Sequence, residues 1–352
     1  MQVDMHYYGT YAMARAAGIP KDGAEVIAYA AQFVDDSTRY DSGQNPDGGL
    51  LFGITTSHTP KESFIDNIED VKNDNAEQRR IWVPFHFFPG GAGDSFQEKI
   101  LCVKDSSLVN EMLNNHLTHG ATKKFSLELM GIAAHVYMDT FSHYGFSGMS
   151  SDFNSVAPDS VKCITKPNAG ILSYITEKLE KAIGSAAEAG SDSLGHAGAA
   201  TFPDRPFLHW GFEFNMPRPN GETKSERDNP KTFLEGCERL HDFFSRYAAA
   251  RYPKSVATRK NFVEIKDEVE DILAFEGAAE ERCERWHASA LAAEAPEYIP
   301  ETWEDEKRET FGHLPVSSEG IDTNSYRFHQ AAAYHRYYVL KDLLPAHGIA
   351  VY

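Results

Sequence analysis

The hydrophobic positions along this chain follow the spacing of an α-helix almost throughout. In residues 21–38 they line one side of a predicted helix, whose apolar face is Val26, Ile27, Ala30, Phe33 and Val34. Residues 230–251 and 255–292 have a heptad-like apolar spacing with many glutamates on the other face. The pattern predicts an all-α protein. The expected helices cover residues 6–17, 21–38, 95–117, 121–146, 168–188, 230–251, 255–292 and 323–344.

Three segments break this pattern. Residues 39–60 and 189–229 are rich in glycine and polar residues and exceed the usual length of a connection, which favours functional loops. Residues 81–91 are apolar and end in Pro-Gly-Gly, so we expect an extended segment closed by a turn.

The length of 352 residues allows one large domain or two. No internal repeat or low-complexity linker divides the chain, so we expect a single α-helical domain over residues 1–352. Its parts are a metal-site helical core with long loops (1–229) and a helical C-terminal layer (230–352).

The most informative stretch lies inside the expected helix 121–146. His135, Asp139 and His143 are spaced at i, i+4 and i+8 and therefore share one stripe of that helix. Their neighbours are small or apolar, so the helix is expected to be buried. Buried ionisable groups are costly unless they are paired, and a divalent metal pairs with them well. The alternative is a hydrogen-bonded core His–Asp pair with a chance second histidine.

Composition narrows the function classes. The net charge of −18 argues against binding nucleic acid or anionic membranes through surface charge, although metal ions can invert a local field. The four cysteines are far apart, which excludes a Cys-x-x-Cys zinc site and a disulfide framework. No signal peptide and no apolar run of about 20 residues is visible, so we expect a cytoplasmic protein without a transmembrane segment.

Further metal-ligand types occur outside the central helix. His86 stands between two phenylalanines, and His209 and Glu213 would be one turn apart on a helix. The full set of candidates is Asp4, His6, Asp35, Asp36, His86, His196, Asp204, His209 and Glu213.

This set and its order resemble the superfamily of zinc-dependent phospholipases C and fungal single-strand-specific nucleases. In that family an N-terminal residue and an early His precede an Asp, a His in an apolar segment, a helix with His-x3-Asp and a further His, and a final His-x3-Glu or His-x3-Asp pair. The segment Trp82-Val83-Pro84-Phe85-His86 is similar to the family's Trp-Pro-Leu-His-like segment. The resemblance covers residues 1–215 and implies a multi-helix fold with up to three zinc ions.

The resemblance implies three ligand sets. The first is His6 and Asp139, with Asp4 in place of the family's N-terminal residue. The second is Asp36, His86 and His135. The third is His143, His209 and Glu213. Three choices stay open: Asp35 or Asp36, His58 or His86, and His196 with Asp204 or His209 with Glu213. His329 and His335 are interpreted as core or surface histidines, and His116 and His119 are assigned no chemistry.

The expected function is therefore a zinc-dependent phosphate-ester hydrolase, either phospholipase C-like or nuclease-like. Its substrate would be a small phosphate ester, a phospholipid or a single-stranded nucleic acid, and no stable protein partner is implied. Asp36 is the expected catalytic base near the water that the metals activate. The alternative is a metal-binding scaffold of the same fold without efficient turnover. A di-metal carboxylate bundle is set aside because no Glu-x-x-His pair lies near the His135 helix.

Overall fold

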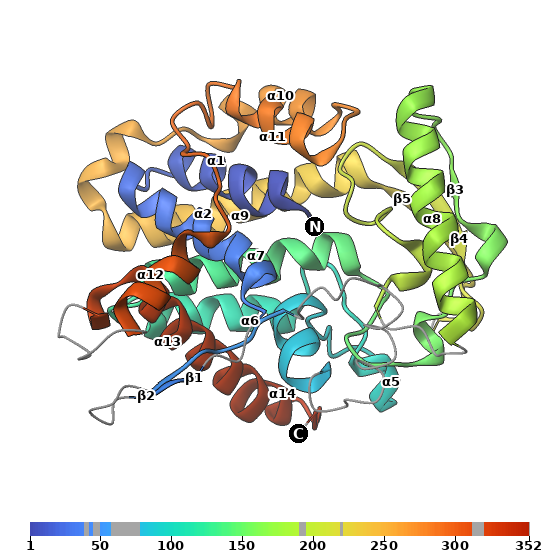
Figure 1. The fold of residues 1–352 in the computed structure, drawn as a ribbon, viewed down its shortest axis with the longest axis horizontal. Coiled ribbons are helices and arrows are strands. Elements are labelled where there is room, and N and C mark those ends of the chain that lie inside the picture. The colour runs from blue at the N-terminus through green and yellow to red at the C-terminus, as the bar shows by residue number, and fades with distance from the viewer. Residues whose placement is uncertain are drawn as a thin grey trace.

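The computed structural model describes residues 1–38, 42–44, 50–57, 78–189, 195–218, 221–311 and 320–351, and most of these residues are helical (Figure 1). The α-helices are α1 (Thr10–Ala16), α2 (Lys21–Asp36), α5 (Phe96–Lys99), α6 (Ser107–Asn115), α7 (Ser126–His143), α8 (Ala169–Ala189), α9 (Asn229–Arg251), α10 (Phe262–Leu273), α11 (Ala279–His287), α12 (Glu301–Phe311), α13 (Asn324–Tyr337) and α14 (Leu344–Ala346). Wider π-helical turns are η1 (Asp4–Gly9), η2 (Gln78–His86), η3 (His116–Gly120) and η9 (Tyr338–Leu343). Short 3-10 turns are η4 (Asp152–Asn154), η5 (Pro158–Ser160), η6 (Ala197–Ala199), η7 (Pro253–Thr258) and η8 (Gly320–Asp322).

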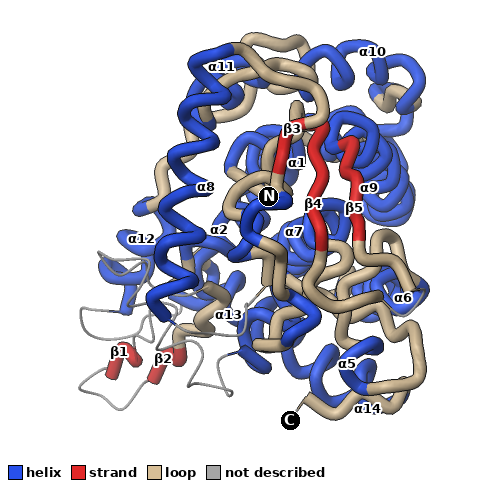
Figure 2. The backbone as a smooth tube through the Cα atoms, turned by 90° about the vertical axis from the view of Figure 1, so that its right-hand side faces the viewer, coloured by secondary structure: helices blue, strands red, loops and turns tan. Residues whose placement is uncertain are grey.

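The described strands form two small antiparallel sheets. One pairs β1 (Ser42–Gln44) with β2 (Leu50–Phe52). The other has the order β3-β4-β5, from β3 (Lys162–Cys163), β4 (His209–Glu213) and β5 (Lys224–Asp228), and pairs His209 with Asp228 and Glu213 with Lys224. This sheet lies beside α8 at one end of the molecule (Figure 1), the end that faces the viewer in Figure 2.

Helices α2 and α7 pack closely at the centre of the fold because small residues face each other. A Cβ atom on Gly131 of α7 would come within 2.4 Å of the Ile27 carbonyl oxygen and 2.6 Å of the Ala30 Cβ in α2. Only glycine permits this approach. Helix α7 is buried along nearly its whole length, as expected for a helix with small or apolar residues on every side.

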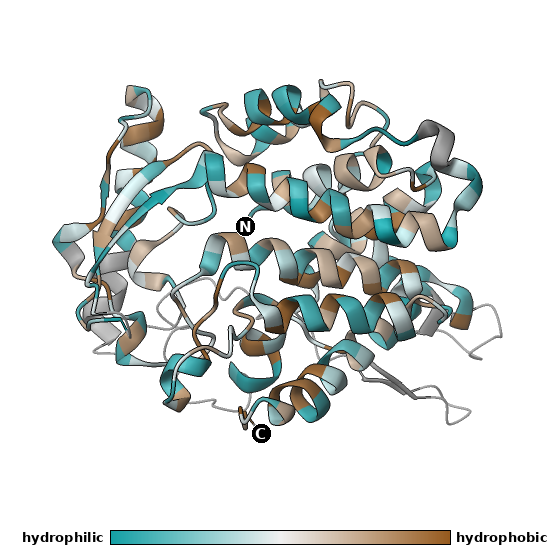
Figure 3. Ribbon diagram, turned by 180° about the vertical axis from the view of Figure 1, so that it is seen from behind, coloured by the Kyte–Doolittle hydropathy of each residue, from teal (hydrophilic) through white to brown (hydrophobic). Residues whose placement is uncertain are grey.

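The larger hydrophobic core joins segments from both ends of the chain, from Met5 in η1 to Leu343 in η9. A smaller core lies under the three-stranded sheet, where Trp210 and Phe212 of β4 stack at 4.9 Å between ring centroids. Hydrophobic and hydrophilic residues alternate around many of the helices (Figure 3). No helix among the described residues is both long enough and apolar enough to cross a membrane.

The structure confirms that the protein is mostly helical, and α2, α7, α8 and α9 lie where the hydrophobic pattern predicts helices. The prediction of one helix over 255–292 is wrong, because α10 ends at Leu273 and α11 begins at Ala279. The predicted loop 189–229 contains β4 and β5.

The predicted extended segment 81–91 begins instead as the π-helix η2, with Pro84 inside it. The Phe87 N–H donates to the Trp82 carbonyl oxygen five residues earlier (2.8 Å), which is the hydrogen bond of a π-turn. Ile81, Val83 and Phe85 are fully buried, so packing overrides the local signal of proline and aromatic residues.

Candidate metal centre

The stripe predicted on the central helix is present on α7. His135, Asp139 and His143 are all at most 5% exposed, and their side chains point to one place inside the molecule. Other elements bring their ends to this place. The additional residues are Met1, His6 from η1, Asp35 from the last turn of α2, His86 from the end of η2, and His196 and Asp204 from the segment around η6.

The first group consists of His86, His135 and Asp139. Asp139 Oδ2 lies 3.2 Å from His135 Nε2 and 3.6 Å from His86 Nδ1, and these two nitrogens are 3.3 Å apart. Two ligands of a tetrahedral zinc ion at 2.0–2.1 Å are separated by about 3.3 Å. One ion therefore fits between these three atoms.

The second group consists of His6, Asp35 and His135. The rings of His6 and His135 stack with centroids 3.8 Å apart, and His6 Nε2 lies 3.2 Å from Asp139 Oδ1. The α-amine of Met1 donates to the same Asp139 oxygen at 2.8 Å and lies 3.3 Å from Asp204 Oδ1. Figure 1 shows the amino terminus inside the molecule, next to the end of α7.

The third group consists of His143, His196 and Asp204. His143 Nε2 lies 3.1 Å from Asp204 Oδ1, and His196 Nε2 lies 3.6 Å from Asp204 Oδ2. The Met1 amine connects this group to the others, because it contacts both Asp139 and Asp204. Asp139 itself faces the other two groups, with Oδ1 toward His6 and Oδ2 toward His86 and His135.

Backbone carbonyls orient four of the histidines. Each of the four places one ring nitrogen against a carbonyl oxygen. The pairs are His135 Nδ1 with Ala31 O (2.8 Å), His86 Nε2 with Thr56 O (2.8 Å), His143 Nδ1 with His86 O (2.8 Å) and His196 Nδ1 with Ala200 O (2.9 Å). A carbonyl only accepts, so that nitrogen carries the proton and, in a neutral ring, the other nitrogen presents a lone pair. This is the usual outer support of histidines that bind a metal.

The lone pairs point at one another and at carboxylates. When both rings are neutral, His86 Nδ1 and His135 Nε2 face each other and Asp139 Oδ2 as acceptors, without a donor between them. Among the described residues, Asp139 Oδ2 and both ring nitrogens of His6 are buried without a hydrogen-bond partner. Such an arrangement is costly unless a cation lies at its centre. Imidazole and carboxylate are donors that zinc and other divalent metals accept.

The electrostatics agree with a cation site. Burial opposes ionisation of Asp139, but the charges of His143, the Met1 amine and His135 outweigh it and hold the Asp139 pKa well below its usual value. Burial, with neighbouring His135 and the Met1 amine, lowers the pKa of His6 to about 3. His6 is therefore neutral at physiological pH and Asp139 is anionic, which are the forms that bind a metal ion.

The structure brings together His6, His86, His135, Asp139 and His143, as predicted, and it favours His196 with Asp204 for the third group. Asp4 lies outside the groups, because its carboxylate is taken by Arg282 Nε at 2.6 Å. Asp36 also lies outside them and accepts hydrogen bonds from Tyr298 and Gln32. His58 lies outside the described residues.

His209 and Glu213 do not join the centre, because they lie on strand β4 rather than on a helix. Four residues span about 13 Å along a strand, against about 6 Å along a helix, so the two side chains cannot share one ion. His209 Nε2 instead lies 2.8 Å from Glu226 Oε1, and Glu213 lies 3.0 Å from Lys224. Both are cross-strand pairs on the outer face of the sheet.

Asp4 was expected in the place of the family's N-terminal residue, whereas in the structure it is the Met1 amine that contacts Asp139. The π-helix η1 starts at Asp4, and Met1 and His6 both lie against Oδ1 of Asp139. The choice between Asp35 and Asp36 depends on where α2 ends, and helix ends are poorly fixed by sequence.

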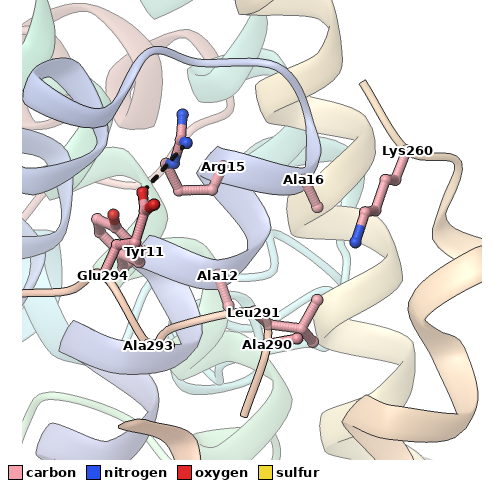
Figure 4. Close-up of a pocket in the computed structure, with 9 residues that line it drawn as sticks. All are labelled: Tyr11, Ala12, Arg15, Ala16, Lys260, Ala290, Leu291, Ala293 and Glu294. Carbon is pink, nitrogen blue, oxygen red and sulfur yellow. Dashed lines mark ion pairs between the residues drawn. The ribbon is translucent and has the colours of Figure 1, made fainter. Parts of the chain in front are cut away.

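A separate pocket of about 330 Å³ lies between α1 and the segment 290–294 (Figure 4). It is lined mainly by alanines, Leu291 and Tyr11, and Arg15 in its wall forms an ion pair with Glu294 at 3.6 Å. No histidine or cysteine lines it, so this pocket is not part of the metal centre.

Comparison with known proteins places the chain in a family. The model of a family of unknown function (DUF6765) matches residues 1–343, and the chain belongs to that family. Searches of curated proteins and of solved structures gave no match.

Proposed function

We propose that this protein is a zinc-dependent hydrolase of phosphate esters. One observation carries the proposal: three His/Asp groups converge around a single buried carboxylate, Asp139, with the unprotonated ring nitrogens facing inward. Up to three divalent ions held a few ångströms apart suit phosphoryl chemistry, because the substrate carries negative charge on several oxygens at once. The resemblance to zinc-dependent phospholipases C and single-strand-specific nucleases supports this function and the corresponding helical fold.

The ligand assignment follows two of the three groups directly. His86, His135 and Asp139 would hold one ion, and His143, His196 and Asp204 would hold another. The remaining group is divided, because His135 serves the first ion: His6 would hold a third ion with Asp139 Oδ1, and Asp35 is not assigned as a ligand. Zinc at these positions would neutralise phosphoryl oxygens and lower the pKa of water toward ~7.

Asp35 is the residue that we propose as general base. Its carboxylate lies 3.7 Å from His86 Nδ1 and 3.9 Å from His135 Nε2, and its side chain is 31% exposed, against 1% for Asp139. Water therefore reaches Asp35. Asp36, the base expected from the sequence, is engaged by the Tyr298 hydroxyl, and burial raises its pKa.

The remaining residues bind and orient. Asp139 stays ionised and can contact two ions through its two oxygens, which keeps the groups at a fixed separation. His143 and His196 lie side by side, with ring centroids 4.7 Å apart, against the two oxygens of Asp204, and would hold the ion that meets the leaving oxygen. The carbonyls of Ala31 and Thr56 fix the ring planes of His135 and His86, so little reorganisation is needed when a substrate binds.

The test is a turnover screen of zinc-loaded protein against phosphomonoesters, phosphodiesters, phospholipids and single-stranded nucleic acid. Asp139→Asn serves as the inactive variant and Glu213→Gln as the matched control, since Glu213 is an acid outside the centre. We expect turnover of at least one ester by the wild type and the control, and none by Asp139→Asn. Zinc uptake without any turnover would favour the scaffold alternative.

A further inference from the structure

Two histidines of α13, His329 and His335, are buried next to the metal centre without belonging to any of its groups. They are 1% and 0% exposed. His335 contacts the backbone of η2, which contains His86, and His329 contacts the backbone of Ile54, two residues before the Thr56 carbonyl that binds the His86 ring. A buried imidazole that needs a partner at both nitrogens is an expensive way to fill a core. The contacts of His329 and His335 therefore indicate their structural role.

His335 binds the end of the helix that carries His86. Helix η2 ends at His86, and the last carbonyls of a helix have no partner within it. Five residues after Pro84 stands Pro89, which has no N–H, so continuing the π-turn would not supply a donor to the Pro84 carbonyl. The ring of His335 supplies it: its Nε2 lies 2.8 Å from Pro84 O.

A second histidine fixes the orientation of His335. Because His335 Nε2 must donate to the Pro84 carbonyl, its Nδ1 accepts, and His116 Nε2 lies 2.9 Å from that atom as the donor. His116 is also fully buried. The His335 ring additionally packs on Phe85, the residue before His86, with centroids 5.1 Å apart.

His329 acts on the other side of His86. The Ile54 N–H donates to His329 Nδ1 at 3.0 Å, and two residues further the Thr56 carbonyl accepts the Nε2 proton of His86 at 2.8 Å. The Thr56 hydroxyl also donates to Val34 O in α2 at 2.7 Å. The segment that orients the His86 ring is thus tied to α13 on one side and to α2 on the other.

We propose that His335 and His329 are positioning residues for His86, through which α13 sets the geometry of the first metal group. This rests on the proposed function only in that His86 is a ligand there. His335 holds the backbone from which His86 projects, and His329 holds the acceptor that fixes its ring. Outer-layer contacts of this kind change metal affinity about 10- to 100-fold when they are removed.

The test compares three variants of the full-length protein. His335→Phe removes the donor and keeps a ring against Phe85, and His335→Gln keeps an N–H at the Nε2 position. His241→Phe is the matched control, since His241 is a buried histidine of α9 with Nε2 2.9 Å from the Lys260 carbonyl and lies away from the metal groups. Zinc affinity is measured by chelator competition, the ligand field by visible absorption of the Co²⁺-loaded protein, and folding by thermal unfolding.

We expect His335→Phe to weaken the affected zinc ion by about 10- to 100-fold and to change the Co²⁺ spectrum. His335→Gln should recover most of the affinity, and His241→Phe should lower the unfolding temperature without altering zinc affinity or spectrum. Equal zinc affinity and spectrum in His335→Phe and the wild type would overturn the proposal.

A wild-type protein that takes up no metal would contradict the proposed function itself. The positioning role is then decided by crystal structures of the wild type and His335→Phe. A displaced His86 ring supports it, and an unmoved ring overturns it.

Discussion

Two regions of this molecule carry a histidine and an acid four residues apart, and only one of them places the pair in a buried cluster that could hold a metal ion. On α7, His135 and Asp139 lie one helical turn apart, buried, with Nε2 and Oδ2 at 3.2 Å. On β4, His209 and Glu213 lie at the two ends of an extended strand, and each pairs with a charged residue of β5. The spacing in sequence is the same, but the distance and the solvent exposure differ.

The difference shows what the spacing alone leaves out. On a helix, four residues return a side chain to the same face within reach of one ion; on a strand, the same face recurs but about 13 Å further on. Burial then decides how much free energy is lost when a pair is broken. The α7 pair cannot exchange its partners for water, whereas the β4 pairs are partly solvated and are worth little to stability.

The largest effect should come from removing the shared carboxylate. Asp139→Asn takes away the anion that faces His6, His86, His135 and the Met1 amine, so we expect zinc to bind at least 100-fold more weakly at the groups that Asp139 faces. The metal-free protein should lose about 3–5 kcal/mol of unfolding free energy, because buried cationic partners lose their counter-charge. Metal analysis measures the zinc content, and denaturant unfolding measures the unfolding free energy. A variant with wild-type zinc content would refute the shared role of Asp139.

The adjacent acids Asp35 and Asp36 at the end of α2 should separate a catalytic role from a packing role. Asp35→Asn should reduce turnover by about 10²- to 10⁴-fold, the range for loss of a general base. Asp36→Asn should leave turnover near wild type and cost about 1–3 kcal/mol of stability, since Asp36 accepts hydrogen bonds from Tyr298 and Gln32. Steady-state kinetics on the substrate found in the screen decides between them, and the opposite ranking would return the catalytic role to Asp36.

Acid should lower the unfolding free energy through the buried histidines His329 and His335. Burial lowers the pKa of His329 to about 3 and that of His335 to about 4, below the unfolded value near 6.5. The unfolded chain therefore binds more protons on acidification, so the stability these neutral rings contribute is present above pH ~6.5 and declines toward pH ~4. Unfolding free energies of chelator-treated protein across this range check the sign, and a rise in stability toward low pH would contradict it.

The smallest effect should come from the strand pair. His209→Ala removes a contact with Glu226 whose side chain is 69% exposed, so we expect a stability change of about 0–1 kcal/mol and unchanged zinc content. Thermal unfolding and metal analysis of this variant, measured beside His135→Ala, complete the comparison. Loss of zinc in His209→Ala would mean that β4 contributes to the centre after all.

The main helices, and the part of the candidate metal centre that lies on α7, could be predicted from the sequence because they depend on local periodicity. The stripe on α7 follows from the positions of His135, Asp139 and His143 alone, and the burial of α2 follows from its apolar face. What could not be predicted depends on contacts distant in sequence. β4 is a strand because it pairs with β3 and β5, η2 is a π-helix because its apolar side chains are buried, and Asp4 is withdrawn from the centre by Arg282, 278 residues away.

The most direct test of the metal centre is the zinc content per chain of protein purified without chelators or an affinity tag, determined by elemental analysis for the wild type and Asp139→Asn. We predict two to three zinc ions per wild-type chain and at most one in the variant, held by the group of His143, His196 and Asp204, which does not contain Asp139. Zero zinc in the wild type after reconstitution, or equal zinc in both proteins, would contradict a centre built around this carboxylate.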